Sequence, residues 1–315
     1  MCLAGQVHIN RGIFIPLQLP KQRSTQTHPL TGSSSTPEDL AATILHAVRL
    51  GYRHIDTASM YGTEGAVGAA VADAVATGAV ASRADLFITS KLVMKDAHPE
   101  RVLPALRESL ARLGLDYLDL FLIHWPLAAD ENNKFVPFDM EGVWRAMEEC
   151  HRLGLARSIG VSNFSAAKMS RLLAFAAVPP AVNQVELNRQ EKVREVCAKN
   201  GVVVTAFSPL GAFGSMWGSN AVMESGVLQD VAARRGKTIA QVALRWLHEQ
   251  GVCFVARSFN KDRLKQNMEL FDWELNNDDK EKIMGIPQRR ACRGEFFVSP
   301  DGPYKTLEEL WDGEI

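Results

Sequence analysis

The sequence predicts an α/β fold of the (β/α)8 or TIM-barrel class, in a single domain that spans residues 1–315. Short apolar segments alternate with helical segments along most of the chain. The apolar segments are continuously hydrophobic, which is typical of parallel strands that helices cover on both faces. With 315 residues and a hydrophobic content of 46%, one barrel with a large core accounts for the length.

An open, doubly wound sheet is the alternative fold for such an alternating pattern. That fold commonly carries a Gly-x-Gly-x-x-Gly motif after its first strand, and no such motif stands there in this chain. The barrel is therefore the favoured prediction.

The N-terminal region is expected to precede the barrel as a β-hairpin. Residues 7–16 contain two short apolar segments around the turn residues Asn10-Arg11-Gly12. Residues 20–35 are polar and rich in Pro, Ser, Thr and Gly, so they predict a loop. The first helix begins at Thr36, a suitable N-cap, and ends at Gly51.

From there strands and helices alternate in regular order. The expected strands cover residues 53–56, 86–90, 118–124, 157–161, 182–185, 202–207 and 252–256, with one more near 15–19. The expected later helices cover residues 65–77, 99–113, 140–153, 165–176, 191–200, 222–235, 239–249 and 261–270. This order supplies eight β/α units and one additional helix.

Composition excludes several functional classes. Lys and Arg number 35 against 36 Asp and Glu, so a nucleic-acid or anionic-membrane partner is not expected. The five Cys are scattered without close pairs, which argues against a disulfide framework and against a metal site such as a zinc ribbon. No signal peptide and no apolar segment of about 20 residues is apparent. We expect a cytoplasmic monomer that acts on a small molecule.

Four polar residues near the ends of the first strands form a coherent candidate site: Asp56, Tyr61, Lys91 and His124. A phenol has an ordinary pKa of about 10, and a nearby ammonium group would lower it. A carboxylate paired with the ammonium would keep it charged, and an imidazole could hydrogen-bond a substrate oxygen. Each residue alone also has an ordinary structural explanation. Together, they favour a site that gives a proton to a developing oxyanion.

Several long motifs make the chain resemble the aldo-keto reductase superfamily over nearly its whole length. They are GYRHIDTASMYGTE (51–64), LFITSKL (86–92), LDLFLIHWP (118–126), IGVSNF (159–164), AVNQVELN (181–188), FSPLG (207–211) and RSFNKDRLKQN (257–267). The tail 294–315 resembles the plant branch that includes chalcone and codeinone reductases and deoxymugineic acid synthases.

This resemblance implies a reaction and its cofactor. The reaction is hydride transfer from NADPH to an aldehyde or ketone, in which Asp56, Tyr61, Lys91 and His124 are catalytic and Tyr61 supplies the proton. The implied cofactor-binding residues are Ser162, Asn163, Gln184, Phe207, Ser208, Leu210, Arg257, Ser258, Phe259, Arg263, Gln266 and Asn267. Ser162, Asn163 and Gln184 match positions that bind the nicotinamide carboxamide. Ser162 or Asn163 could instead cap the following helix.

The resemblance also implies where each end of the ligand lies. Arg257, Ser258 and Arg263 match the 2′-phosphate site, and two guanidiniums with a hydroxyl suit a phosphate dianion. The substrate pocket is expected from Met60, Trp125, Phe138, Phe296 and Phe297, under a long C-terminal tail, although these side chains could equally be ordinary packing.

Two departures from the family pattern stand out. Phe207 replaces a Tyr that stacks on nicotinamide, which keeps an aromatic face. Leu17–Ser35 lacks the usual Gly-x-Gly-Thr segment of the first barrel strand. A catalytically weakened NADPH-binding or regulatory barrel is therefore an alternative. A Schiff-base enzyme that uses Lys91 is another, although a pairing with Asp56 would keep Lys91 protonated.

Overall fold

The computed structural model describes residues 36–186, 190–213, 215 and 218–314. The expected hairpin 7–16, the expected strand near 15–19 and the altered segment Leu17–Ser35 lie outside these residues. Seven parallel strands form one sheet in the order β1-β2-β3-β6-β7-β8-β9. They are β1 (His54–Asp56), β2 (Phe87–Leu92), β3 (Leu118–Ile123), β6 (Ala156–Ser162), β7 (Val182–Glu186), β8 (Val203–Phe207) and β9 (Cys253–Val255).

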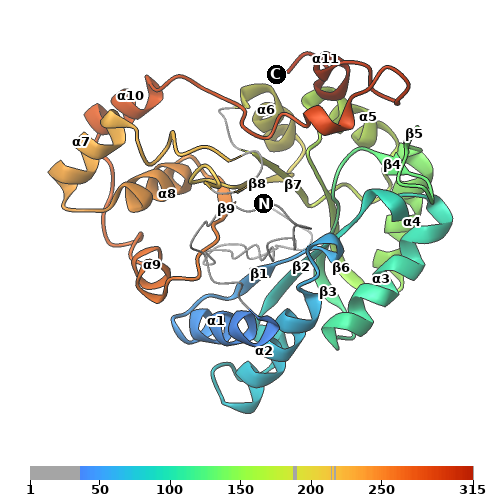
Figure 1. The fold of residues 1–315 in the computed structure, drawn as a ribbon, viewed down its shortest axis with the longest axis horizontal. Helices are drawn as coiled ribbons and strands as arrows, with labels where there is room; N and C mark the ends of the chain where they lie inside the picture. Colours follow the sequence, from blue (N-terminus) through green and yellow to red (C-terminus); the bar gives the residue numbers. More distant parts are fainter. Residues whose placement is uncertain (1–35, 187–189, 214, 216–217, 315) are drawn as a thin grey trace, which may run out of the picture.

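Helices surround these strands, as the view in Figure 1 shows. They are α1 (Pro37–Arg49), α2 (Glu64–Ala76), α3 (Pro99–Leu113), α4 (Met140–Arg152), α5 (Ala166–Phe175), α6 (Glu191–Lys199), α7 (Gly226–Arg235), α8 (Ile239–Glu249), α9 (Lys261–Gln266), α10 (Asn277–Met284) and α11 (Leu307–Trp311). Among the described helices, none combines the length and the apolar character that crossing a membrane requires.

The two ends of the seven-stranded sheet approach one another. The hydroxyl of Tyr52, which lies between α1 and β1, donates to the Leu264 carbonyl in α9 across 2.9 Å, although 212 positions separate the two residues. The sheet is therefore a nearly closed barrel, and the predicted (β/α)8 class is confirmed. Every residue of β3 is buried, as a continuously apolar strand beneath helices should be.

Gly160 lets β6 and β7 approach closely. A Cβ atom at this position would lie 2.6 Å from the Val182 carbonyl oxygen and 2.8 Å from the Leu122 side chain. A side chain would therefore force the two strands apart. These strands end at Ser162 and Glu186, so their spacing sets the positions of the residues at the mouth of the barrel.

Some element boundaries differ from the expectations. The helix expected at 222–235 begins at Gly226, because the Ser225 side chain accepts a hydrogen bond from the Leu228 amide and caps it there. The helix expected at 261–270 ends at Gln266. The short hairpin of β4 (Ala128–Ala129) and β5 (Phe135–Val136) has too few residues to produce a recognisable pattern.

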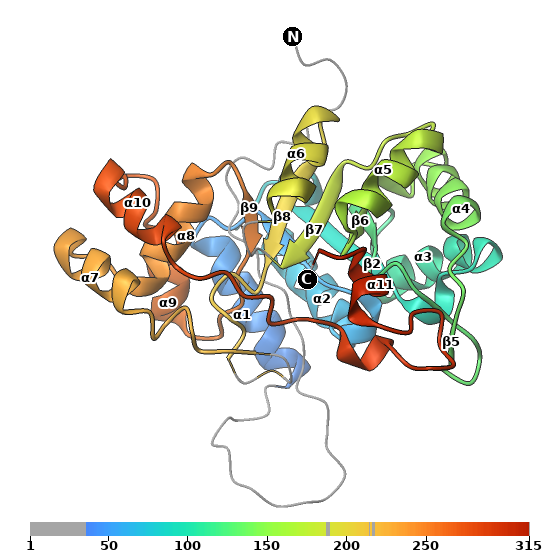
Figure 2. The same cartoon turned by 90° about the horizontal axis from the view of Figure 1, so that it is seen from above.

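The C-terminal tail crosses one end of the barrel. Figure 2 shows the segment between α10 and α11 running across the end toward which β7 and β8 point. In a barrel of this class, residues at the carboxyl ends of the strands share one face, and that face carries the site. The tail therefore lies over the expected position of the catalytic residues.

Candidate active site

The four residues predicted to be catalytic come together at the carboxyl ends of three adjacent strands. Asp56 ends β1, Lys91 is the penultimate residue of β2, and His124 follows β3 directly. Tyr61 ends a 3₁₀ turn, Ser59–Tyr61, after β1. Because neighbouring strands pair in parallel, with Asp56 opposite Thr89 and Lys91 opposite Leu122, the ends lie at one level.

Asp56 and Lys91 form an ion pair that is almost completely buried. The Lys91 ammonium donates to Oδ1 of Asp56, and both side chains are 1% exposed. It also donates to the Thr57 carbonyl across 2.9 Å and lies 5.3 Å from the centroid of the Tyr61 ring. A buried charge needs such partners. The pairing holds the ammonium beside the phenol and opposes use of Lys91 as a free amine.

The Tyr61 hydroxyl contacts His124. Its oxygen lies 3.2 Å from Nε2 of the imidazole, and the two rings meet edge-on with centroids 5.6 Å apart. Nδ1 of His124 is buried and has no hydrogen-bond partner within the described ranges. The phenol and the imidazole thus converge on one point, as two groups must if both are to reach a single substrate oxygen.

Burial controls the protonation of this site. Burial raises the pKa of the Tyr61 hydroxyl well above its usual value, and the nearby Asp56 and Cys292 raise it further. The expected net lowering of the Tyr61 pKa beside Lys91 is therefore not found, because desolvation of the phenolate dominates. Burial also lowers the pKa of Lys91 from 10.5, although Asp56 opposes this shift. Burial, with the Lys91 charge, lowers the pKa of His124 well below 6.5.

These directions leave Tyr61 as a neutral phenol and His124 as a neutral imidazole near pH 7. The phenol keeps the proton that a donor must supply. The ammonium of Lys91 beside it would stabilise the phenolate that forms when the proton leaves.

A group of side-chain amides and a hydroxyl adjoins the four residues. Nε2 of Gln184 donates to Oδ2 of Asp56 across 2.8 Å. Nδ2 of Asn163 donates to the His124 carbonyl at 3.0 Å and to the Ser162 hydroxyl at 3.1 Å. The Ser162 hydroxyl donates to the Gln184 carbonyl at 2.7 Å. Neither Ser162 nor Asn163 caps α5, because that role belongs to Ser165.

This group fits the carboxamide of a nicotinamide ring. Oδ1 of Asn163 is buried and has no hydrogen-bond partner in the part of the chain that the structure describes. Such an oxygen costs free energy unless a donor reaches it, and a carboxamide NH₂ is a suitable donor. The left-handed backbone of Asn163, with φ of 63°, turns the chain at this point.

Comparison with known proteins identifies the family. Residues 25–287 match the model of the aldo/keto reductase family. The chain belongs to the aldo/keto reductase family. It is an NADPH-dependent oxidoreductase that reduces carbonyl groups. The alternative of a weakened nucleotide-binding barrel is not favoured.

Similar aldo/keto reductases occur in plants and insects. Deoxymugineic acid synthase 1 of Oryza sativa subsp. japonica is 54% identical over 290 residues, which cover 89% of this chain and 91% of the relative. Rhazimal reductase 2 of Alstonia scholaris is 52% identical, over 88% of this chain and 90% of the relative. The crystal structure of a Bombyx mori aldo-keto reductase in complex with NADP superimposes with a TM-score of 0.78 at 35% identity, covering 86% of this chain and 87% of that one.

In this aldo/keto reductase, the residues expected around the cofactor phosphates follow β9. Arg257 is exposed, with its guanidinium 5.8 Å from the centroid of the Phe259 ring. Ser258 is buried, and its hydroxyl accepts from the Asn260 amide at 3.2 Å. The Asn260 side chain caps α9 through the Arg263 amide. Arg257 and Ser258 thus precede the N-cap Asn260, and Arg263 lies in the first turn of α9.

The remaining cofactor candidates are more widely spread. Gln266 is exposed in the last turn of α9, and Asn267 is buried directly after it. Phe207 ends β8 and is half-buried. Ser208 and Leu210 follow in a turn in which Ser208 has a φ of 50°. Both lie at the same end of the barrel as Gln184.

The tail forms one wall beside Tyr61, and sequence reasoning missed part of it. Trp125 is buried, with ring centroids 4.5 Å from Phe297 and 5.8 Å from Trp311. Trp311 and Cys292 were not among the expected pocket residues, although Trp311 lies in the tail 294–315 that the sequence singled out and Cys292 lies just before it. Only their packing distinguishes them from other tail residues.

The other expected pocket residues divide into two groups. Met60 and Phe296 are exposed, at 43% and 53%. Phe138 is half-buried and packs edge-on against the core residue Phe164, with centroids 6.4 Å apart. Phe138 therefore contributes to the core around α4 and α5.

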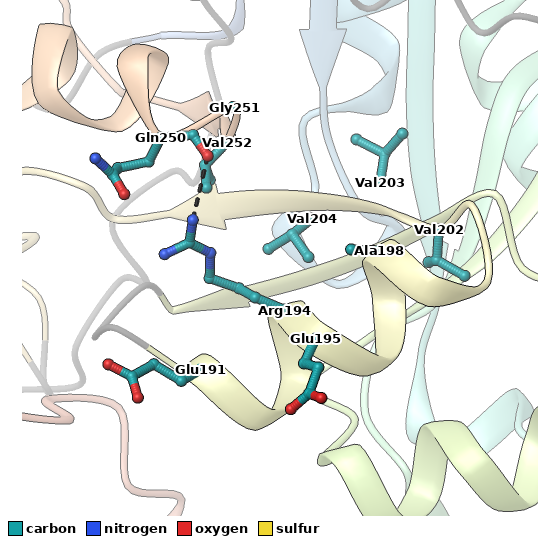
Figure 3. Close-up of a pocket in the computed structure, with 10 residues that line it drawn as sticks. All are labelled: Glu191, Arg194, Glu195, Ala198, Val202, Val203, Val204, Gln250, Gly251 and Val252. Carbon is teal, nitrogen blue, oxygen red and sulfur yellow. Dashed lines mark hydrogen bonds between the residues drawn. The ribbon is translucent and has the colours of Figure 1, made fainter.

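A separate cavity of about 500 Å³ lies at the opposite end of the strands (Figure 3). It is lined by α6 and by the amino-terminal ends of β8 and β9: Glu191, Arg194, Glu195, Ala198, Val202, Val203, Val204, Gln250, Gly251 and Val252. Arg194 donates to the Gln250 carbonyl across 3.2 Å, as the dashed line in Figure 3 marks. This cavity is therefore separate from the four residues at the carboxyl ends of the strands.

Proposed function

We propose that Tyr61 donates the proton in the reduction of a small aldehyde or ketone. The observation that carries this proposal is the 3.2 Å contact between its hydroxyl and His124, beside the buried Lys91–Asp56 pair. The raised pKa of Tyr61 keeps its proton in place until charge develops on the substrate oxygen. His124 then donates or shares a hydrogen bond with that oxygen, and Lys91 stabilises the phenolate.

Bound NADPH supplies the hydride. We propose that Ser162, Asn163 and Gln184 hold its carboxamide, and that Arg257, Ser258 and Arg263 hold its 2′-phosphate. Oδ1 of Asn163, which is buried without a partner among the described residues, supports the first assignment. The second is supported by Asn260, whose amide donates to the Ser258 hydroxyl and whose side chain accepts from the Arg263 amide. Phe207, Ser208, Leu210, Phe259, Gln266 and Asn267 complete the proposed cofactor site.

The substrate binds, in this proposal, between Tyr61 and a wall formed by Met60, Trp125, Phe296 and Phe297. A largely apolar and aromatic wall favours a substrate with apolar surface around its carbonyl. The plant relatives named rhazimal reductase 2 and 7-acetyl-epi-neemfruitin B aldo-keto reductase support a substrate of plant secondary metabolism. We further propose that the enzyme acts as a cytoplasmic monomer without a nucleic-acid partner.

The test is a steady-state assay with NADPH and a reactive aldehyde such as nitrobenzaldehyde. Consumption of NADPH that is lost in the Tyr61→Phe variant, with NADPH binding retained, would support the assignment. Turnover that survives in this variant would contradict it. Trapping with borohydride should leave Lys91 unmodified, because its ammonium is paired with Asp56.

A further inference from the structure

One lysine of α5 is buried against the C-terminal tail. Lys168 is 3% exposed, and its Nζ donates to the Leu310 carbonyl at 2.8 Å and to Oδ2 of Asp312 at 2.6 Å. The same Nζ lies 5.1 Å from the centroid of the Tyr304 ring. All three partners belong to the tail. Since a buried ammonium is unfavourable without partners, the tail and Lys168 hold each other in place.

Two further contacts join the start of α5 to the end of the tail. The Ser165 hydroxyl donates to Oδ2 of Asp312. The Ala166 amide, in the first turn of α5, donates to the Glu314 carboxylate across 3.0 Å. Carboxylates are favourable at this end of a helix, because the free amide groups and the helix dipole are positive there.

The first part of the tail is fixed by a different strand. The Glu186 carboxylate, at the end of β7, accepts from the Ala291 amide at 3.1 Å and from the Cys292 amide at 2.7 Å. The Arg290 guanidinium lies 3.6 Å from the centroid of Trp311, and it donates to the Glu314 carbonyl at 3.0 Å. The tail is therefore attached at both ends.

The C-terminal tail packs directly against Trp125, the residue that follows His124. The Trp311 indole donates to the Arg293 carbonyl at 2.7 Å and packs against Trp125. At Gly294, a Cβ atom would lie 2.9 Å from Leu310 and 3.6 Å from the Trp125 ring, so the tail backbone contacts both directly. Movement of α11 would therefore move the wall that Trp125 and Phe297 share.

We propose that Lys168 and Asp312 form a latch that fixes tail residues 290–314 over the substrate side of the site. Lys168 is then a positioning residue that determines substrate affinity without touching the substrate. The proposal rests on the proposed function, in which substrate binds between Tyr61 and this tail. The latch acts on the substrate wall, so it should affect KM for the carbonyl compound and leave NADPH affinity unchanged.

The test compares Lys168→Met with a matched surface control, Lys199→Met. Methionine keeps the length of the stem, and Asp312 can then be solvated because it is 32% exposed. Lys199 pairs with Glu195, but it is 70% exposed and lies on α6, outside the latch. Full-length proteins are examined by amide hydrogen exchange, by NADPH fluorescence titration and by kinetics with nitrobenzaldehyde.

In Lys168→Met, we expect exchange in residues 290–314 to accelerate about tenfold or more, while β6 and β7 stay protected. KM should rise about tenfold, because displacement of a wall by about 1 Å is sufficient for such losses. NADPH affinity should stay within about twofold, and Lys199→Met should match the parent protein.

Unchanged exchange in the tail, or unchanged KM, would overturn the latch. If Lys168→Met does not fold, Asp312→Asn weakens the same ion pair at its more exposed residue. Unchanged exchange in the tail or unchanged KM in that variant would likewise overturn the latch. Failure of the proposed function is separable from failure of the latch. Turnover that persists in Tyr61→Phe would remove the catalytic assignment but would leave the exchange result in the tail intact.

Discussion

Nε2 of Gln184 lies 2.8 Å from Oδ2 of Asp56, and this hydrogen bond connects β7 to β1, strands that are not neighbours in the sheet. The other oxygen of the same carboxylate accepts from Lys91. One carboxylate thus joins the proposed cofactor amides to the ammonium beside Tyr61. Each of its oxygens has its own donor, which orients the Gln184 amide with its nitrogen toward Asp56.

This relationship predicts an order of stability for two variants. Gln184→Met removes a hydrogen bond to a buried charge and should lower the free energy of unfolding by about 1.5–3 kcal/mol. Gln184→Glu should lower it further, because a second carboxylate would face Asp56. Urea denaturation measures both. Gln229→Glu is the control, since this side chain is exposed on α7. Equal stability of the Gln184 variants would contradict the prediction.

Tyr61→Phe should separate catalysis from binding. Loss of the proton donor should lower kcat by about 10²–10⁴-fold, while NADPH affinity stays within about twofold. Stopped-flow measurement of NADPH consumption and fluorescence titration report the two quantities. Tyr117→Phe provides the control, because Tyr117 precedes β3, at the opposite end of that strand from His124, and should leave kcat unchanged.

The kcat/KM for reduction should not change with pH near neutrality and should fall only in alkaline solution. The pKa of His124 lies well below 6.5, so His124 should stay neutral from about pH 6 to 8. The pKa of Tyr61 is raised and that of Lys91 is lowered from 10.5, so Lys91 should lose its proton first as pH rises. Loss of that charge should slow reduction. A profile of kcat/KM with an inflection near pH 6.5 would show that a protonated His124 is involved after all.

Arg263→Ala should weaken NADPH binding and spare NADH. Loss of one guanidinium from a phosphate site costs about 1.5–3 kcal/mol, which corresponds to about 10–150-fold in affinity. NADH lacks the 2′-phosphate, so its affinity should not change. Lys265→Ala, also exposed on α9, controls for a general loss of positive charge. Equal losses for both nucleotides would argue against a 2′-phosphate contact.

Glu64 should be a major contributor to stability. Its carboxylate is buried, accepts from the Ser90 hydroxyl at 2.7 Å, and pairs with Arg112 at 2.6 Å. Glu64→Ala should cost about 2–4 kcal/mol in the free energy of unfolding, since it leaves buried Ser90 without this acceptor. Glu195→Ala, which breaks an exposed pair with Lys199, should cost about 0.5 kcal/mol or less. Chemical denaturation that ranks the two variants equally would refute this reading of Glu64.

The features that the sequence predicted well follow from the apolar character of the strands and from the polar residues at their carboxyl ends. Asp56, Lys91 and His124 follow apolar strands, and parallel pairing brings their ends to one level without further information. The same rule places Ser162 and Gln184 beside them. The seven described strands follow from their continuous apolar character.

The features that the sequence did not reveal depend on tertiary packing. Lys168 and Asp312 are 144 positions apart, and each resembles an ordinary surface charge. Phe138 could face a pocket or the core, and only the position of Phe164 decides between them. The direction of the Tyr61 pKa shift was mistaken because desolvation depends on how closely other chain segments surround the hydroxyl.

The close approach of β6 and β7 at Gly160 has a consequence for genetics. A random mutagenesis screen for inactive clones should recover substitutions at Gly160, since a methyl group there would collide with the Val182 carbonyl oxygen two residues before Gln184. Such clones would contain intact Tyr61, Lys91 and His124 and would nevertheless lack activity. A map of inactivating alleles should therefore extend beyond the residues that any ligand touches.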